Sequence, residues 1–121
     1  LHLPMAVALC SAALGMVVTT ATRTLTIAEA KGATRGKFLG DDDSTGGKVW
    51  DAGRVLADVL TTDYAERLPA MSVFELGSGT GVGGLTAASS GAQVTLTDGS
   101  PGVLPLLEAN VRVNKLESKA R

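Results

Sequence analysis

The sequence predicts an α/β fold built around one βαβ unit, because three patterns follow one another within a short stretch. Residues 73–76 form a short apolar run, typical of a parallel strand that is buried on both faces. A glycine-rich turn leads into a helical pattern over residues 81–89, and a second strand pattern occupies residues 93–97. The crossover of such a unit is expected to be right-handed.

Composition limits the chain to one small domain and excludes several function classes. The chain has 121 residues, of which 45% are hydrophobic, and this is enough for a single core. Aromatic residues make up 3% and the net charge is −1, so no nucleic-acid partner is expected. Cys10 and His2 are the only residues of their types, which argues against a disulfide, a serine–histidine–aspartate triad and a metal site. The single cysteine fits a cytoplasmic protein.

Residues 1–22 contain no charged side chain and allow three interpretations. The stretch Leu3–Val18 is rich in small and apolar residues and is close to the length of about 20 that a membrane span needs. It lacks the positive region of a secretory signal. The segment is therefore a core or docking helix, a membrane or organelle-targeting segment, or non-native sequence at the edge of a fragment. Membrane attachment is not the preferred interpretation, but it stays open for these residues.

Residues 22–28 alternate and are rich in β-branched side chains, which predicts a strand. Glycine-containing turns follow, and residues 37–39 are the expected returning strand of a hairpin. The acidic segment 41–47 departs from a calcium-binding loop, because the twelfth position is Ala52 instead of glutamate. A solvated loop that caps the next helix is expected instead.

A helix is predicted from Lys48, since apolar residues recur there at three- and four-residue spacing. Its apolar face consists of Val49, Ala52, Val55, Leu56, Val59 and Leu60. Trp50 lies just off that face, where its ring either closes the end of the core or covers a ligand beside the glycine turn. A further helix is predicted after Pro101, with Pro105 tolerated only in its first turn. The polar residues 115–121 are expected to fray.

The glycine turn carries the strongest chemical signal in the sequence. Counted from the end of the strand, its glycines are Gly77, Gly79 and Gly81. Glycine permits positive φ angles and lets a ligand approach the backbone. The helix that follows points unpaired N–H groups at whatever lies above the turn. Dinucleotides, phosphate-bearing nucleotides and S-adenosylmethionine all use such a turn.

Two acidic residues flank this turn. Asp98 ends the second strand, 21 residues after Gly77, where a carboxylate accepts hydrogen bonds from an adenosine ribose. Glu75 lies two residues before Gly77. A carboxylate there favours the cationic groups of S-adenosylmethionine and repels a pyrophosphate. A salt-bridged carboxylate at a strand end is the alternative for Glu75.

The segment Val73–Gly81 resembles the first motif of seven-strand S-adenosylmethionine-dependent methyltransferases. The blocks at residues 47–52, 94–99 and 104–111 are similar to the methyltransferase-like group of protein-lysine methyltransferases. The resemblance covers about residues 46–114. It implies a truncated Rossmann-like methyltransferase fold with a βαβ unit and an N-terminal hairpin and helix. Residues 23–121 would then form the N-terminal half of a methyltransferase domain, preceded by the apolar segment 1–22.

The resemblance also implies roles for individual residues around S-adenosylmethionine. The turn residues Gly77, Ser78 and Gly79 would support the methionine end of the cofactor, and Asp98 would hold the ribose. Trp50 would lie against the cofactor pocket, and Glu75 would face the methionine amino group directly or through water.

The implied reaction is transfer of the methyl group to a lysine side chain of a protein substrate, an in-line displacement that depends on alignment of the reactants. The motifs that the family uses for adenine and for the target lysine are not found in these 121 residues. No catalytic residue is therefore assigned. A non-enzymatic adenosine-ligand or interaction fragment and a dinucleotide-binding βαβ unit remain as alternatives.

Overall fold

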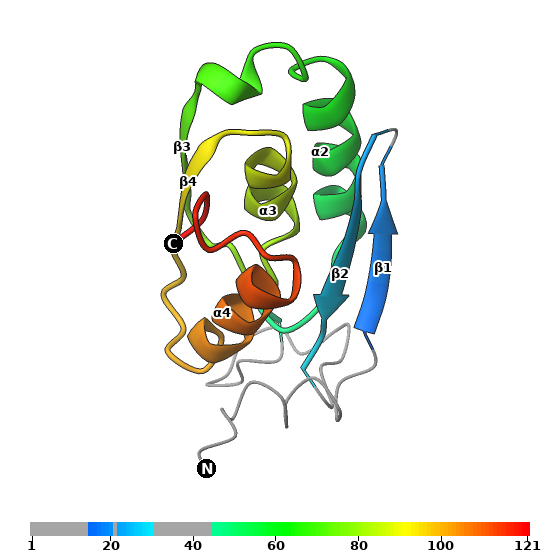
Figure 1. The fold of residues 1–121 in the computed structure, drawn as a ribbon. Helices are drawn as coiled ribbons and strands as arrows, with labels where there is room; N and C mark the ends of the chain where they lie inside the picture. The colour runs from blue at the N-terminus through cyan, green and yellow to red at the C-terminus, as the bar shows by residue number, and fades with distance from the viewer. Residues whose placement is uncertain (1–14, 21, 31–44) are drawn as a thin grey trace.

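The structure, a computed structural model, describes residues 15–20, 22–30 and 45–121 (Figure 1). The predicted strand at 37–39 and residues 41–44 of the acidic segment lie outside the described residues, as do residues 1–14 of the apolar segment. The described elements are β1 (Gly15–Thr19), β2 (Thr24–Ala28), α2 (Asp51–Thr62), a 3-10 turn (Leu68–Ala70), β3 (Ser72–Glu75), α3 (Val82–Ser89), β4 (Gln93–Leu96) and α4 (Leu104–Val113).

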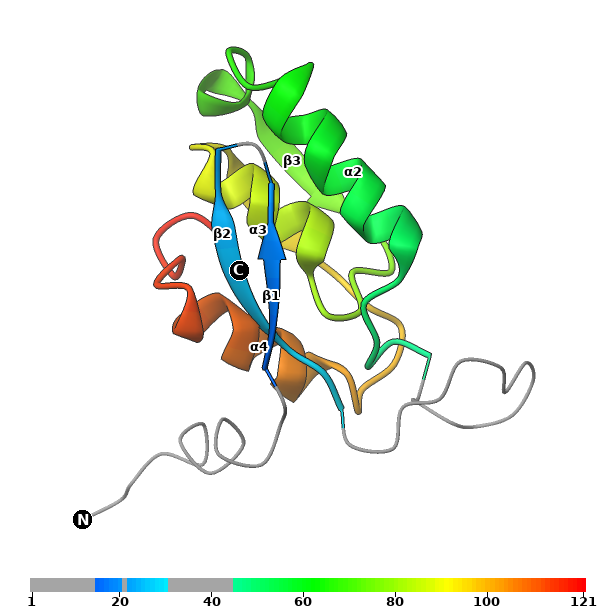
Figure 2. The same ribbon diagram turned by 90° about the vertical axis from the view of Figure 1, so that its right-hand side faces the viewer.

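The predicted βαβ unit is present as β3, α3 and β4. The two strands are parallel, and Glu75 at the end of β3 is in register with Leu96 at the end of β4. Helix α3 is buried from Val82 to Ala88, because it lies between this sheet and the hairpin β1–β2 (Figure 1). Figure 2 views the molecule from the hairpin side, with β1 and β2 in front of α3. The mixed α/β architecture agrees with the sequence-based prediction.

Strand β2 pairs with a strand that the sequence analysis did not predict. Residues 15–19, within the apolar segment, pair antiparallel with residues 24–28 in a register that joins Gly15 to Ala28 and Thr19 to Thr24. The helix considered for Leu3–Val18 is therefore wrong for its last residues. Val18, Leu25 and Ile27 point into the core, which explains the alternation seen in the sequence. The predicted boundary between segment 1–22 and segment 23–121 falls in the turn of this hairpin.

Helix α2 begins at Asp51, three residues later than expected, and Trp50 occupies its N-cap position without a side-chain cap. Only Ala57 and Thr61 of this helix are buried. Leu56 reaches α3, because a Cβ atom added at Gly83 would lie 2.9 Å from its Cδ2 atom. The predicted apolar face is wrong in part, because Val55 is 62% exposed and Leu56 is 44% exposed. Burial in α2 therefore follows the size of the side chain more than its hydrophobicity.

Helix α4 begins at Leu104, so Pro105 lies in its first turn as predicted, whereas Pro101 precedes the helix. The expectation that residues 115–121 fray is wrong. The Val94 N–H donates to the Lys119 carbonyl at 2.8 Å, and the Leu96 N–H donates to the Arg121 carbonyl at 2.8 Å. Ala120 is buried and forms a parallel bridge to Val94. The C-terminal tail thus pairs with β4 along the edge opposite β3.

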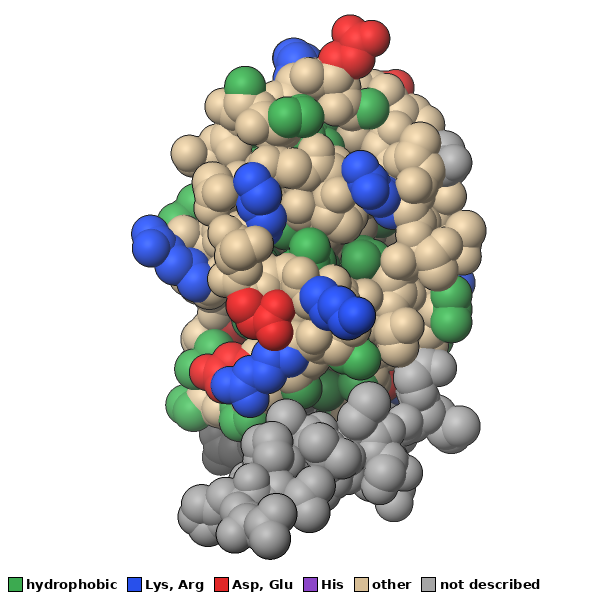
Figure 3. Space-filling model, in the orientation of Figure 1, with side chains coloured by type: hydrophobic (Ala, Val, Ile, Leu, Met, Phe, Trp, Pro, Cys, Tyr) green, Lys and Arg blue, Asp and Glu red, His purple; other side chains and the backbone are tan. Residues whose placement is uncertain are grey.

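Figure 1 shows the helices and the hairpin on one side of the β3–β4 sheet. Side chains on the other side are open to solvent, and Phe74 is 64% exposed. Leu76, which follows β3, is 79% exposed. The face in Figure 3 carries Lys and Arg side chains interspersed with Asp and Glu. Arg112 and Glu108 of α4 form an exposed ion pair. Within the described residues, no helix has both the length and the apolar character that a membrane crossing demands.

Candidate ligand-binding site

The turn between β3 and α3 adopts a shape that requires its glycines. Gly77, Gly79 and Gly81 have φ angles of 64°, 55° and 89°. Any other residue type at these positions would cost about 1–2 kcal/mol each. The turn is tied to the end of β4, because the Ser78 N–H donates to the Thr97 carbonyl at 2.8 Å. The glycines that the turn needs are therefore Gly77, Gly79 and Gly81, the set obtained by counting from the end of β3.

The three glycines differ in what surrounds them. A Cβ atom added at Gly81 would lie 2.6 Å from Cδ1 of Leu107, so this glycine allows α4 to pack against the turn. A Cβ atom at Gly79 would lie 3.0 Å from the carbonyl oxygen of Gly46. At Gly77, the same atom would meet nothing within 4 Å. The open side of the turn, where a ligand has room to approach the backbone, is therefore at Gly77.

The structure brings Asp98 against the glycine turn. Its Oδ2 atom accepts a hydrogen bond from the Gly79 N–H at 2.9 Å, and its Oδ1 atom accepts one from the Ser100 N–H at 2.9 Å. The side chain thus bridges the end of β4 and the turn that follows β3. Parallel strands place their carboxyl ends at one edge, where ligands of open α/β sheets bind. Asp98 lies at that edge.

Glu75 lies behind the turn, beneath the first turn of α3. Its Oε1 atom accepts a hydrogen bond from the Gly84 N–H at 3.1 Å. Its Oε2 atom is shut off from solvent and has no hydrogen-bond partner among the described residues. Burial raises the pKa of this carboxyl above its ordinary value, while the Ser78 hydroxyl and the Gly84 N–H act in the opposite direction. The positive end of α3 compensates part of the burial.

Ser78 is buried and directs its side chain inward. Its hydroxyl accepts a hydrogen bond from the Thr97 N–H at 3.1 Å. Any contact between Ser78 and a ligand in this geometry would therefore use the backbone. The hydroxyl instead helps to hold the turn on the end of β4.

Trp50 joins the site through a neighbouring segment. Its indole Nε1 donates to the Thr45 carbonyl at 3.0 Å, and the ring is 39% exposed. Gly46, the next residue, is the one that abuts Gly79. The same segment is tied to the hairpin, because the Ala30 N–H donates to the Gly47 carbonyl at 2.9 Å. Trp50 therefore lies on a short link between the hairpin and the glycine turn.

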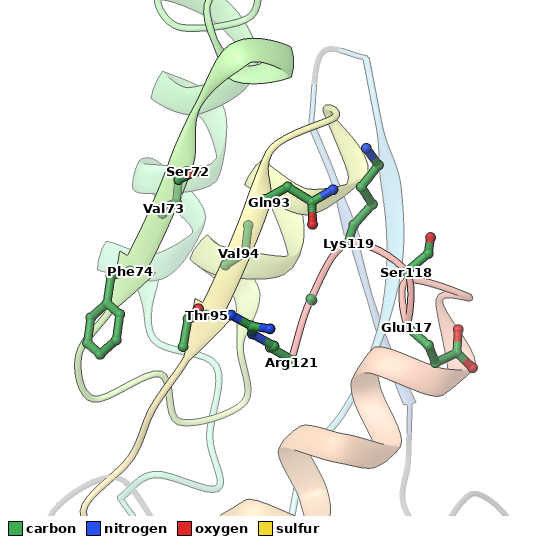
Figure 4. A pocket seen from close by; sticks show the side chains of 11 residues that line it. Ser72, Val73, Phe74, Gln93, Val94, Thr95, Glu117, Ser118, Lys119 and Arg121 are labelled. Atoms are coloured by element: carbon green, nitrogen blue, oxygen red, sulfur yellow. The ribbon is translucent and has the colours of Figure 1, made fainter.

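A pocket of about 510 Å³ lies over the sheet on the side away from α3 (Figure 4). It is lined by Ser72, Val73, Phe74, Gln93, Val94, Thr95, Glu117, Ser118, Lys119, Ala120 and Arg121. None of the sequence-predicted site residues belongs to this set. The pocket is separate from the candidate site at the glycine turn.

Sequence reasoning assigned no role to Asn110, which is fully buried and contacts the turn. Its Nδ2 atom donates to the Thr80 carbonyl at 2.9 Å. A signal for this contact was present in the sequence, because Asn110 interrupts the apolar stripe of α4 between Leu107 and Val111. A polar side chain on a buried stripe needs hydrogen-bond partners.

A glycine turn between parallel strands, with an acid at the end of the second strand, defines an α/β domain of the adenosine-binding type. Residues 38–121 match the family model described as lysine methyltransferase. The chain belongs to this lysine methyltransferase family, and S-adenosylmethionine is the methyl donor that such membership implies.

Individual relatives agree with the family match. The chain is 47% identical over 66 residues to "Protein N-lysine methyltransferase METTL21A" of Danio rerio and, equally, of Mus musculus, which covers 54% of this chain and 29% of each relative. It is 39% identical over 67 residues to "EEF1A lysine methyltransferase 3" of Mus musculus, which covers 55% of this chain and 28% of the relative. The matched part therefore spans less than a third of these relatives.

Proposed function

We propose that this chain forms the S-adenosylmethionine-binding part of a protein-lysine N-methyltransferase. The observation that carries the proposal is the hydrogen bond of 2.9 Å between Asp98 and the Gly79 N–H. It fixes an acid of the ribose-binding type beside the open backbone at Gly77. Family membership supports the donor, and the names of the relatives support a lysine side chain of a protein as the acceptor.

The residues present fit this cofactor in two respects. The backbone at Gly77 leaves the space that a bound group needs. Each oxygen of Asp98 accepts a backbone N–H, and a carboxylate oxygen has a second lone pair for a ribose hydroxyl. When bound, S-adenosylmethionine supplies an electrophilic methyl group on a sulfonium centre. The protein then has to hold that group in line with a neutral amine.

Each predicted site residue has a place in this proposal. The backbone of Gly77, Ser78 and Gly79 holds the methionine end, and Trp50 forms a wall of the pocket. Glu75 acts on the ammonium group from behind the turn through its charge, because its carboxylate is turned toward α3 and its Oε2 atom is shut off from solvent. We further propose residues 23–121, together with the paired strand β1, as the N-terminal half of the methyltransferase domain, and the cytoplasm as its location.

Calorimetric titration of the full chain with S-adenosylmethionine tests the proposal. Asp98→Ala removes hydrogen bonds to a charged group, so binding should weaken by about 1.5–3 kcal/mol, which is more than tenfold. Asp58→Ala is the matched control, because Asp58 is an exposed acid on α2. It should leave the affinity unchanged. Equal affinities of wild type and Asp98→Ala would contradict the assignment.

Two alternatives give different results in the same titration. Tight binding of NAD without binding of S-adenosylmethionine would indicate a dinucleotide-binding unit. Binding of S-adenosylmethionine without methyl transfer to any lysine-containing protein would indicate a non-enzymatic adenosine-ligand module. The exposed side chains of Phe74 and Leu76 are the observation that favours an interaction role.

A further inference from the structure

Two asparagines, Asn110 within α4 and Asn114 at its C-cap, lie along the edge of β2 that β1 leaves unpaired. Asn110 Oδ1 accepts from the Ala28 N–H at 2.8 Å, and its Nδ2 donates to the Ala28 carbonyl at 3.1 Å. Asn114 Oδ1 accepts from the Thr26 N–H at 2.9 Å, and its Nδ2 donates to the Thr26 carbonyl at 2.8 Å. Each amide thus makes the pair of hydrogen bonds that a neighbouring strand would make.

The two asparagines differ in their remaining contact. Asn114 Nδ2 also donates to the Asn110 carbonyl at 2.8 Å, within its own helix. Asn110 Nδ2 instead also donates to the Thr80 carbonyl at 2.9 Å, inside the glycine turn. Asn110 is 0% exposed and Thr80 is 3% exposed, so water cannot replace this bond. One amide group therefore joins β2, α4 and the turn.

The position of Thr80 makes this contact important for the shape of the turn. Its neighbours Gly79 and Gly81 both have positive φ angles. Glycine has a wide choice of backbone conformations, so its own preferences do not hold such a turn. Hydrogen bonds from neighbouring elements must therefore fix the shape of the turn. The bond from Asn110 to the Thr80 carbonyl is the one that comes from α4.

We propose that Asn110 is a positioning residue that holds the glycine turn in its binding shape and makes cofactor affinity depend on the docked hairpin β1–β2. The proposal rests on the proposed function for its cofactor. The hairpin contributes because Ala28 fixes the orientation of the amide whose Nδ2 atom reaches Thr80. Loss of either partner would leave a buried polar group without its hydrogen bond.

The test compares Asn110→Asp with Asn114→Asp in the full chain. Each variant keeps the side-chain size and the acceptor for the β2 N–H, and each loses its donor to two carbonyl groups. The two variants differ in which carbonyl loses its partner, because only Asn110 serves the glycine turn. Two further variants separate general destabilisation from loss of the turn contact. Asn110→Ser removes the donor to Thr80 without adding a charge. Leu68→Val loosens the core at the 3-10 turn, outside both the hairpin and the glycine turn.

The first readout is amide hydrogen exchange of Ser78, Gly79 and Gly81, whose N–H groups are all hydrogen-bonded within the site. Both Asn110 variants should raise these exchange rates by about tenfold or more, whereas Asn114→Asp should change them by less than about twofold. Equal effects of the Asn110 variants and of Leu68→Val, compared at matched thermal stability, would overturn the proposal.

The second readout is the affinity for S-adenosylmethionine, which should fall about tenfold in Asn110→Asp and stay near the wild-type value in Asn114→Asp. If the wild type binds no S-adenosylmethionine while the turn amides still exchange faster in the Asn110 variants, the proposed function fails and the positioning role stands. If wild type and Asn110→Asp bind equally well, the positioning role fails and the proposed function stands.

Discussion

Replacing glycine by alanine should destabilise the protein at Gly84 in α3 and stabilise it at Gly53 in α2. An alanine at Gly84 would place its Cβ atom 2.6 Å from Oε2 of Glu75 and 3.3 Å from Cγ1 of Val94, and closer still to Cδ2 of Leu96. Atoms in folded proteins do not approach a Cβ atom so closely, so α3 must move away from the sheet. At Gly53, the nearest atom would be Cβ of Val82 at 3.8 Å, which is an ordinary contact.

The expected magnitudes follow from these distances. Replacing glycine by alanine inside a helix gains about 0.4–1 kcal/mol, largely because the unfolded chain loses freedom. For Gly53→Ala nothing opposes that gain. For Gly84→Ala, overpacking costs about 1–3 kcal/mol, and the shift of α3 also strains the hydrogen bond of 3.1 Å from the Gly84 N–H to Glu75. We expect a net loss of about 1–2 kcal/mol.

Denaturant unfolding followed by far-ultraviolet circular dichroism measures both variants in one experiment. Gly53→Ala should raise the midpoint and Gly84→Ala should lower it, with the same dependence on denaturant concentration as the wild type. A Gly84→Ala variant as stable as the wild type would refute the reasoning. It would mean that α3 is not held tightly over Glu75 and the sheet.

Two further predictions concern single charged side chains. Burial raises the pKa of Glu75 in the folded protein, so its contribution to stability is fully present below its unfolded value of 4.5 and is lost as the pH rises through the folded pKa. Glu75→Gln should flatten that fall when the free energy of unfolding is measured from pH 4.5 to neutrality, and an unchanged pH profile would contradict this. Lys115 has a φ of 55° after α4, so Lys115→Gly should raise thermal stability by about 0.5–1 kcal/mol, and a lower melting temperature would count against strain at this position.

The βαβ unit could be predicted from the sequence because its signals are local. A positive φ angle is a demand on one residue, and glycine is the residue that meets it easily. The spacing of Gly77, Gly79 and Gly81 therefore predicts which positions of the turn have positive φ angles. The alternation along residues 24–28 likewise records which side chains of β2 face the core.

The partners of these elements could not be predicted, because pairing depends on segments that are distant in the sequence. Backbone hydrogen bonds have no side-chain signature, so the polar tail gave no sign that Ala120 lies against Val94. The pairing of residues 15–19 with β2 also depends on backbone hydrogen bonds, so it could not be predicted either. In α2, hydrophobic periodicity favoured Val55, whereas the structure buries Ala57 and leaves Val55 exposed.

Glu75 shows how a motif can combine two physical requirements. The sequence-based argument assigned its charge to the ligand, and the structure adds a second role, because the carboxylate accepts a hydrogen bond from α3. A Cβ atom at Gly83 or at Gly84 would lie 2.6 Å from one of its oxygens. The glycines of this segment thus form two groups: Gly77, Gly79 and Gly81 shape the turn, and Gly83 and Gly84 make room for the acid.

The residues Gly79, Gly81 and Gly84 match the spacing G-x-G-x-x-G of dinucleotide-binding proteins, but this set mixes the two groups. Its last member has no positive φ angle and lies against the sheet, where a ligand cannot reach it. The spacing that resembles a dinucleotide fingerprint therefore arises from the packing of Glu75 under α3. The packing of Glu75 under α3 and the hydrogen bond from Asn110 to Thr80 both support the turn from behind. The backbone at Gly77 on the opposite side therefore stays open for a cofactor.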